Sequence, residues 1–88
     1  MDEMVVKELD DIELIVSHWK DDYMKYVTGK NDEYLFEEFL EELDTHVSPK
    51  VRRLYENKYI DYNEMGIFMD RCYKHLMELR EAIDEARL

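Results

Sequence analysis

Three side chains near the C-terminus have the chemistry of zinc ligands. Cys72, His75 and Glu78 follow one another at intervals of three residues, and thiolate, imidazole and carboxylate groups all bind Zn²⁺. A tetrahedral zinc site needs four ligands, and the sequence offers no second pair of ligands that would complete such a site. Cys72 also falls in a row of apolar residues, where cysteine packs as a small hydrophobic side chain. We therefore predict a core position for Cys72 and no metal.

Two acidic groups could instead hold magnesium. Glu37, Glu38 and Glu41 form an EExxE pattern, and Glu81 with Asp84 forms an ExxD pattern. The pair of patterns resembles that of the all-α MazG-like nucleotide pyrophosphatases, and the resemblance implies magnesium bound by carboxylates and bridged to substrate phosphates. However, 39 residues separate the two patterns here, which is longer than usual in that family. A magnesium-dependent pyrophosphatase is therefore an alternative, and we assign no family.

Other catalytic arrangements lack partners. The serines are Ser17 and Ser48 only, and Gly29-Lys30 has no glycine-rich run before it, as a phosphate-binding loop requires. Arg71 and His75 lie one helical turn apart without a supporting polar group. We predict that the protein is not an enzyme and uses no cofactor.

One basic segment interrupts the acidic chain. Residues 48–59 hold four basic side chains and one acidic side chain, whereas the whole chain has a net charge of −11. The segment could contact phosphates or an acidic partner. It could also offset the neighbouring acidic helices or pair across a dimer. The candidate partner-binding residues are Lys50, Arg52, Arg53, Tyr55 and Lys58.

The elements that position these residues follow from two heptad rows of apolar side chains. Residues three and four apart share one face of a helix, so each row predicts one long amphipathic helix. The helix at about 3–27 has the row Val5, Leu9, Ile12, Val16, Trp19, Tyr23 and Tyr26. The helix at about 62–86 has the row Tyr62, Met65, Met69, Cys72, Leu76, Leu79, Ile83 and Ala86.

Local signals set the expected helix ends. Gly29 is a good stop for the first helix, Asn31 or Asp32 can cap the next one, and Asp61 with Glu64 forms a capping-box pattern. Gly66 predicts either a close approach of another backbone or a late start of the last helix.

Between the long helices we predict a middle helix broken into about 33–46 and 49–58. Ser48-Pro49 is typical of an N-cap followed by proline at the first helical position, so the helix should stop or kink there. The fold class predicted is all-α, an antiparallel three-helix bundle formed by residues 1–88 as a single domain. A four-helix arrangement, with the two middle pieces folded back on each other, is the alternative.

Composition narrows the class of protein. The chain begins Met1-Asp2-Glu3 and contains no apolar run near the ~20 residues of a membrane span. The lone cysteine excludes an intramolecular disulfide. We therefore expect a cytoplasmic protein, without contact with membranes or direct contact with nucleic acid, whose negative charge favours basic partners.

The function predicted from these features is that of a small, non-enzymatic protein-interaction module, acting as a homodimer. Its motivation is that no catalytic group is complete, while the apolar surface is generous for a monomer. The first alternative is an acidic inhibitor or nucleic-acid mimic, since residues 1–47 carry a net charge of −11 and could occupy a basic cleft of a host protein. Regular rows of exposed carboxylates on one face would favour that alternative.

Overall fold

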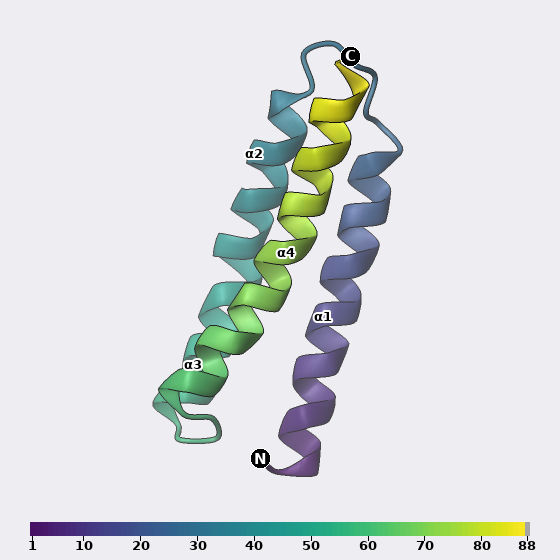
Figure 1. Ribbon diagram of the computed structural model, residues 1–88. Coiled ribbons are helices and arrows are strands. Elements are labelled where there is room, and N and C mark those ends of the chain that lie inside the picture. Colours follow the sequence, from purple (N-terminus) through teal and green to yellow (C-terminus); the bar gives the residue numbers. More distant parts are fainter. Residues whose placement is uncertain (88) are drawn as a thin grey trace.

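A computed structural model describes residues 1–87 as three antiparallel helices side by side, forming a rod of 45 × 18 × 18 Å (Figure 1). The predicted all-α bundle with two long outer helices and a broken middle helix is confirmed. The middle helix is broken only by a change of helical type, and its pieces join end to end from Glu33 to Glu56, so they do not fold back on each other. The elements are α1 (Glu3–Met24), α2 (Glu33–Glu42), η1 (Leu43–Val47), α3 (Ser48–Glu56) and α4 (Tyr62–Ala86).

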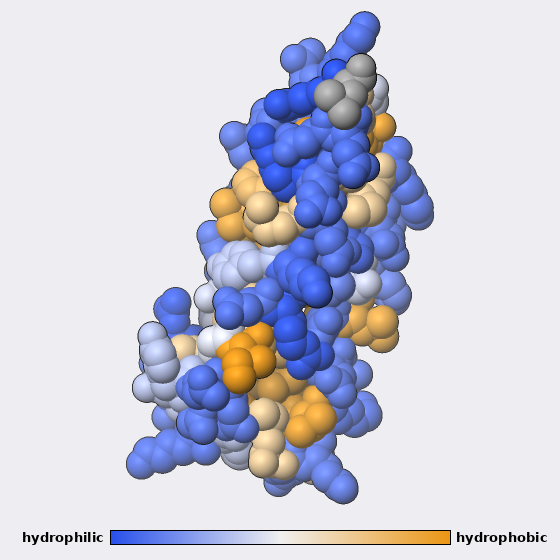
Figure 2. Space-filling model, in the orientation of Figure 1, coloured by the Kyte–Doolittle hydropathy of each residue, from blue (hydrophilic) through white to orange (hydrophobic). Residues whose placement is uncertain are grey.

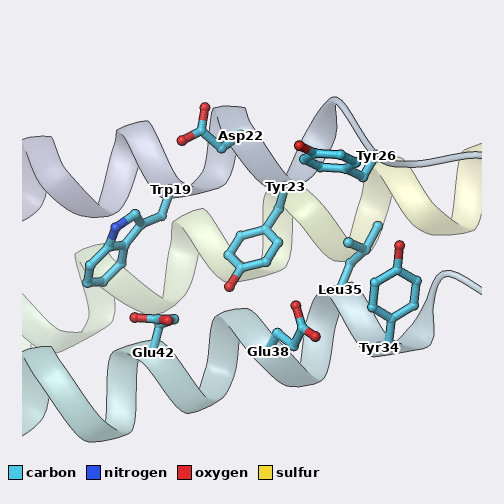
Figure 3. A pocket seen from close by; sticks show the side chains of 8 residues that line it. All are labelled: Trp19, Asp22, Tyr23, Tyr26, Tyr34, Leu35, Glu38 and Glu42. Carbon is cyan, nitrogen blue, oxygen red and sulfur yellow. The ribbon is translucent and has the colours of Figure 1, made fainter.

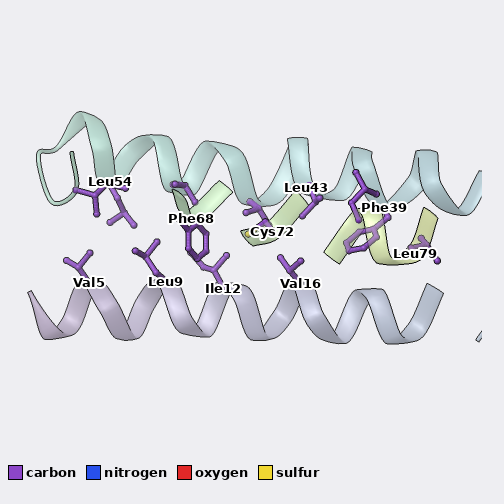
Figure 4. Close-up of a cluster of buried hydrophobic side chains, with 14 of the residues drawn as sticks. Val5, Leu9, Ile12, Val16, Phe39, Leu43, Leu54, Phe68, Cys72 and Leu79 are labelled. Carbon is purple, nitrogen blue, oxygen red and sulfur yellow. The ribbon is translucent and has the colours of Figure 1, made fainter. Parts of the chain in front are cut away.

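The core runs the length of the rod between the three helices (Figure 4). α1 contributes Val5, Leu9, Ile12 and Val16, and α4 contributes residues from Phe68 to Ile83. The outer ends of both predicted rows lie outside it: Tyr26 is 63% exposed and Tyr62 is 73% exposed. Phe68, which lies directly before Met69 of the predicted row, is only 2% exposed. Phe68 is therefore covered by other residues of the same chain and is not free to contact a second copy.

The middle helix keeps one face toward the core through a change of helical type. Its buried side chains recur at intervals of four residues, and in an α-helix each such step overshoots one turn by about 40°. η1 is a π-helical segment, in which the Ser48 N–H donates to the Leu43 carbonyl. Because a π-helical turn holds more residues than an α-helical turn, it returns the row to the same face. That row is Leu35, Phe39, Leu43, Val47 and Val51.

Ser48 does not cap a new helix, and the prediction of an N-cap there is wrong. Its backbone is helical, with φ −54° and ψ −44°, and α3 has no side-chain cap. Pro49 does lie in the first turn, as predicted. The π-helical segment directly before it lets the chain pass the proline without ending the helix.

α1 ends at Met24, three residues before the predicted end, and a short loop then leads to α2. Gly29 is therefore a loop residue, with φ +91°, and not the residue that stops α1. Asp32 is a buried carboxylate, 2% exposed, and it makes no cap bond to α2. It accepts hydrogen bonds from the Thr28 N–H and hydroxyl and from the Gly29 N–H instead, at 2.8–3.2 Å. The sequence-based role of Asp32 as a helix cap is thus replaced by that of a loop anchor.

The start of α4 agrees with its sequence signal. Asp61 accepts a hydrogen bond from the Glu64 N–H at 2.7 Å, and Glu64 accepts one from the Asp61 N–H at 2.9 Å. Both expectations for Gly66 are wrong, since it lies inside α4 and a Cβ built on it would meet no atom within 4 Å.

Candidate functional site

Charged side chains bridge two of the three interfaces between helices. Between α1 and α4, Lys20 pairs with Glu78 at 2.6 Å, and Glu13 is bound by Arg71 and His75. Between α4 and α2, Arg80 pairs with Glu33 at 2.7 Å. Hydrogen bonds from Lys20 and Arg80 lower the pKa values of Glu78 and Glu33, which keeps both carboxylates charged.

The third interface, between α1 and the middle helix, lacks such charged pairs in the part of the chain that the structure describes. Among residues 1–87, no ion pair joins α1 to the segment 33–56. A ring contact crosses it, in which Tyr23 stacks on Phe39 with 5.3 Å between ring centroids. Three adjoining cavities, with volumes of about 420, 370 and 240 Å³, line this interface. We call this feature the open groove.

Each wall of the open groove comes from one helix. The α1 wall includes Ile15, Trp19, Asp22 and Tyr26. The wall on the middle helix is a row at four-residue spacing, one position before the buried row. It consists of Tyr34, Glu38, Glu42, His46 and Lys50. The row passes from aromatic and acidic side chains to a basic one, so the groove has an acidic end and a basic end.

The acidic end is also the aromatic end (Figure 3). In Figure 3 the Tyr23 ring reaches from α1 toward α2, with Trp19 and Glu42 on one side of it and Tyr26 and Tyr34 on the other. Glu38 extends from α2 into the space between the two helices. Leu35, which is 2% exposed, lies at the base of the cavity. Aromatic rings and carboxylates from both helices therefore border one space of about 420 Å³.

The charge of this space is negative on both walls. Burial raises the pKa of Tyr23, and the nearby carboxylates of Glu42, Glu38 and Glu41 raise it further. Lys25 lies 3.4 Å from the Asp22 carboxylate, and the His46 imidazole lies 3.7 Å from the Glu42 carboxylate. No ion pair within residues 1–87 includes Glu38. Because the walls carry the same sign, no salt bridge can form across the acidic end.

The structure does not gather the predicted basic residues into one site. Lys50 lines the basic end of the open groove. Arg52 borders a separate hollow between α3 and α4. Tyr55 and Lys58 border a third hollow, at the turn before α4, where Lys58 has φ +65°. Lys50, Arg52, Arg53 and Lys58 are exposed, and none forms an ion pair with any residue in the range 1–87. They therefore make no direct ion pair with the neighbouring acidic helices in the described part of the chain.

The candidate metal ligands do not converge. In the described part of the chain there is no group of three or more histidine, cysteine, aspartate or glutamate residues placed to hold a metal ion. His75 Nε2 lies 3.2 Å from the Glu13 carboxylate, and Glu78 accepts a hydrogen bond from Lys20. Glu81 and Asp84 lie on exposed positions of α4, where Asp84 pairs with Arg80 at 3.5 Å. The structure thus does not assemble either carboxylate pattern around a common centre.

Cys72 lies in the core, fully buried, as the row of α4 predicts. Burial raises the pKa of its thiol to about 12. Since the thiolate is the reactive form, we expect Cys72 to resist a thiol reagent such as DTNB in the native protein at pH 8. Reaction should become fast only in denaturing urea. Rapid labelling of the native protein at pH 8 would show that this core position opens to solvent.

Comparisons with protein-family models, with curated proteins and with solved structures found no match. In addition, none of the helices within residues 1–87 is long and apolar enough to cross a membrane. The sequence placed Trp19, Tyr23 and Tyr26 on the apolar row of the first helix, and Glu38 in a candidate magnesium-binding pattern. The signal that could have found the groove is the four-residue row that begins at Tyr34, adjacent to the apolar row on the same helix.

Proposed function

We propose that this chain is a non-enzymatic protein-interaction module that binds a basic, amphipathic helical segment of a partner protein in the open groove. The observation that carries the proposal is the contrast between the interfaces. Charged pairs bridge two of them, whereas the third presents Glu38, which forms no ion pair within residues 1–87, beside aromatic rings. An apolar helix face with flanking cations would bury the rings and supply the missing positive charge.

The dimensions of the groove suit a helix. Its wall on the middle helix runs from Tyr34 to Lys50, and a helical rise of 1.5 Å per residue makes that wall about 24 Å long. A partner helix of about four turns would cover it. Such a helix would pack as a fourth member of the bundle, which is a common arrangement of antiparallel helices.

The test uses a synthetic 18-residue helical peptide with leucines on one face and lysines and arginines on the other. Trp19 lines the groove and is the single tryptophan, so its fluorescence reports binding directly. We expect saturable binding at 50 mM salt and at least about tenfold weaker binding at 500 mM, because screening shortens the reach of charge interactions. A peptide with glutamates in place of the basic residues should not bind.

A matched pair of variants separates the groove from the overall charge. Glu38→Gln removes a carboxylate of the groove, whereas Glu37→Gln removes an exposed carboxylate on the same helix that does not line it. Both variants have the same net charge. The basic peptide should bind Glu38→Gln several-fold more weakly than Glu37→Gln. Equal binding to the two variants would overturn the groove as the site.

In the homodimer predicted from the sequence, the partner that binds the groove would be a second copy of this chain. The basic residues Lys50, Arg52 and Arg53 of one copy would then face the acidic groove of another. In Figure 2 the hydrophobic patches on one face of the rod are small and separated by hydrophilic side chains. On α4, Ile67 and Met77 are 55% and 52% exposed. Sedimentation equilibrium at about 10 μM decides the point, since a single 10.8 kDa species would exclude the dimer at that concentration.

The nucleic-acid mimic stays a separate prediction, and it differs from the interaction module in the surface that would bind the partner. It would bind a basic cleft through rows of exposed carboxylates, and Glu37 is as exposed to such a cleft as Glu38. Glu13 and Glu33 are already bound by basic side chains of α4, which reduces the carboxylates free for mimicry. A mimic would be weakened equally by Glu37→Gln and Glu38→Gln, and the module would not.

A further inference from the structure

The acidic end of the open groove has the composition of a site for an organic cation. We propose that the 420 Å³ cavity bordered by Trp19, Tyr23, Tyr26 and Tyr34 receives the guanidinium group of an arginine side chain from the partner segment. This inference rests on the proposed function and specifies the side chain that the groove recognises.

The aromatic rings supply the first part of the argument. The face of an aromatic ring attracts a cation, and tryptophan and tyrosine are the most effective rings for this purpose. Here Trp19, Tyr23 and Tyr26 come from α1 and its C-terminal turn, and Tyr34 comes from α2. Tyr26 and Tyr34 are 63% and 49% exposed, so their rings remain available to a ligand. Rings from two helices therefore border the space that a cation would enter.

The carboxylates supply the second part. Asp22 lies on the α1 side of the cavity, and Glu38 and Glu42 lie on the α2 side. Burial raises the pKa of the neighbouring Tyr23 phenol, and the carboxylates of α2 raise it further. Glu38 has no cationic partner in the described chain. A ligand cation would thus form the salt bridge that the free protein lacks at this end.

Shape favours arginine over lysine. The guanidinium is planar, stacks on aromatic faces and binds a carboxylate through two parallel N–H donors, whereas an ammonium is a compact and strongly hydrated charge. The cavity offers both stacking surfaces and a free carboxylate, with Leu35 at its base for the aliphatic stem. At the opposite end of the groove Lys50 repels a cation. The bound segment should therefore place its arginine at the end of the groove near Tyr34.

The experiment compares 18-residue basic peptides that differ at one residue, with Trp19 fluorescence as the readout. The parent peptide carries a single arginine at one end, and the others carry lysine or the neutral isostere citrulline there. We expect about tenfold weaker binding with citrulline and about threefold weaker binding with lysine. Equal affinity of the arginine and citrulline peptides would overturn the pocket while leaving the proposed function standing.

Two further measurements test where the arginine binds and whether the ligand is a peptide side chain or a free cation. Tyr34→Ala should weaken the arginine peptide about tenfold and the citrulline peptide little, whereas Tyr59→Ala changes an exposed tyrosine outside the open groove and should weaken neither. Equal effects of the two variants would overturn the assignment. N-acetyl-arginine amide should compete with the peptide only weakly, at millimolar concentration. If it bound while no basic peptide did, the ligand would be a free cation, and both the partner side chain and the proposed function would be overturned.

Discussion

Replacing Gly29 with alanine should destabilise the bundle by at least about 1–3 kcal/mol, which is the usual cost of a left-handed backbone at a residue other than glycine. Gly29 has φ +91°, and a Cβ at this position would lie 2.7 Å from the carbonyl oxygen of Ala86. The obstacle is backbone, so the end of α4 or the loop must move. Urea denaturation followed by Trp19 fluorescence would measure the loss.

The matched control is Gly66→Ala, which should stabilise the protein by up to about 1 kcal/mol. Gly66 lies inside α4, and a Cβ there would meet no atom within 4 Å. Alanine would improve the helical propensity of α4 without a packing cost. A shift of the same sign for both variants would contradict the different environments that the structure assigns to the two glycines.

Asp32→Asn should also lower stability substantially, because it changes the anchor of the loop between α1 and α2. The carboxylate accepts hydrogen bonds from the Thr28 N–H, the Thr28 hydroxyl and the Gly29 N–H. An amide has one acceptor oxygen in place of two, and its NH₂ group would face a backbone donor. We expect a fall of several degrees in the melting temperature at pH 7. Asp21→Asn, which removes an exposed carboxylate without an ion pair, is the control and should change little.

The effect of Asp32→Asn should depend on pH. Burial alone would raise the pKa of Asp32, but the hydrogen bonds from Gly29 and Thr28 and the charge of Arg87 outweigh it, and the pKa is lowered. A carboxyl group with a lowered pKa stabilises the folded state above its unfolded pKa of about 3.9 and loses that contribution as the pH falls through the folded value. The difference between wild type and Asp32→Asn should therefore be constant from pH 5 to 8 and shrink below about pH 4. A difference independent of pH down to 2 would contradict the charged anchor.

The sequence by itself determined the features that depend on neighbouring residues. The apolar rows of α1 and α4 predict two long helices because residues three and four apart always share a helical face. Asp61 and Glu64 predict the start of α4 because a capping box involves only one turn of backbone. Pro49 marks the irregularity of the middle helix for the same reason. The helical class, the number of long helices and most of the core of α1 follow from such local rules.

The tertiary structure decided everything that depends on how the helices face one another. Leu35 and Val51 share one buried face only because η1 changes the helical twist between them. A Cβ at Gly29 would meet the backbone of Ala86 only because the loop passes beside the end of α4. Likewise, Glu38 and Trp19 border one cavity because α1 and α2 lie side by side in the bundle. Apolar periodicity fixes which side of a helix is buried, but the rotation and pairing of helices fix which exposed side chains meet, and those depend on contacts between residues far apart in the chain.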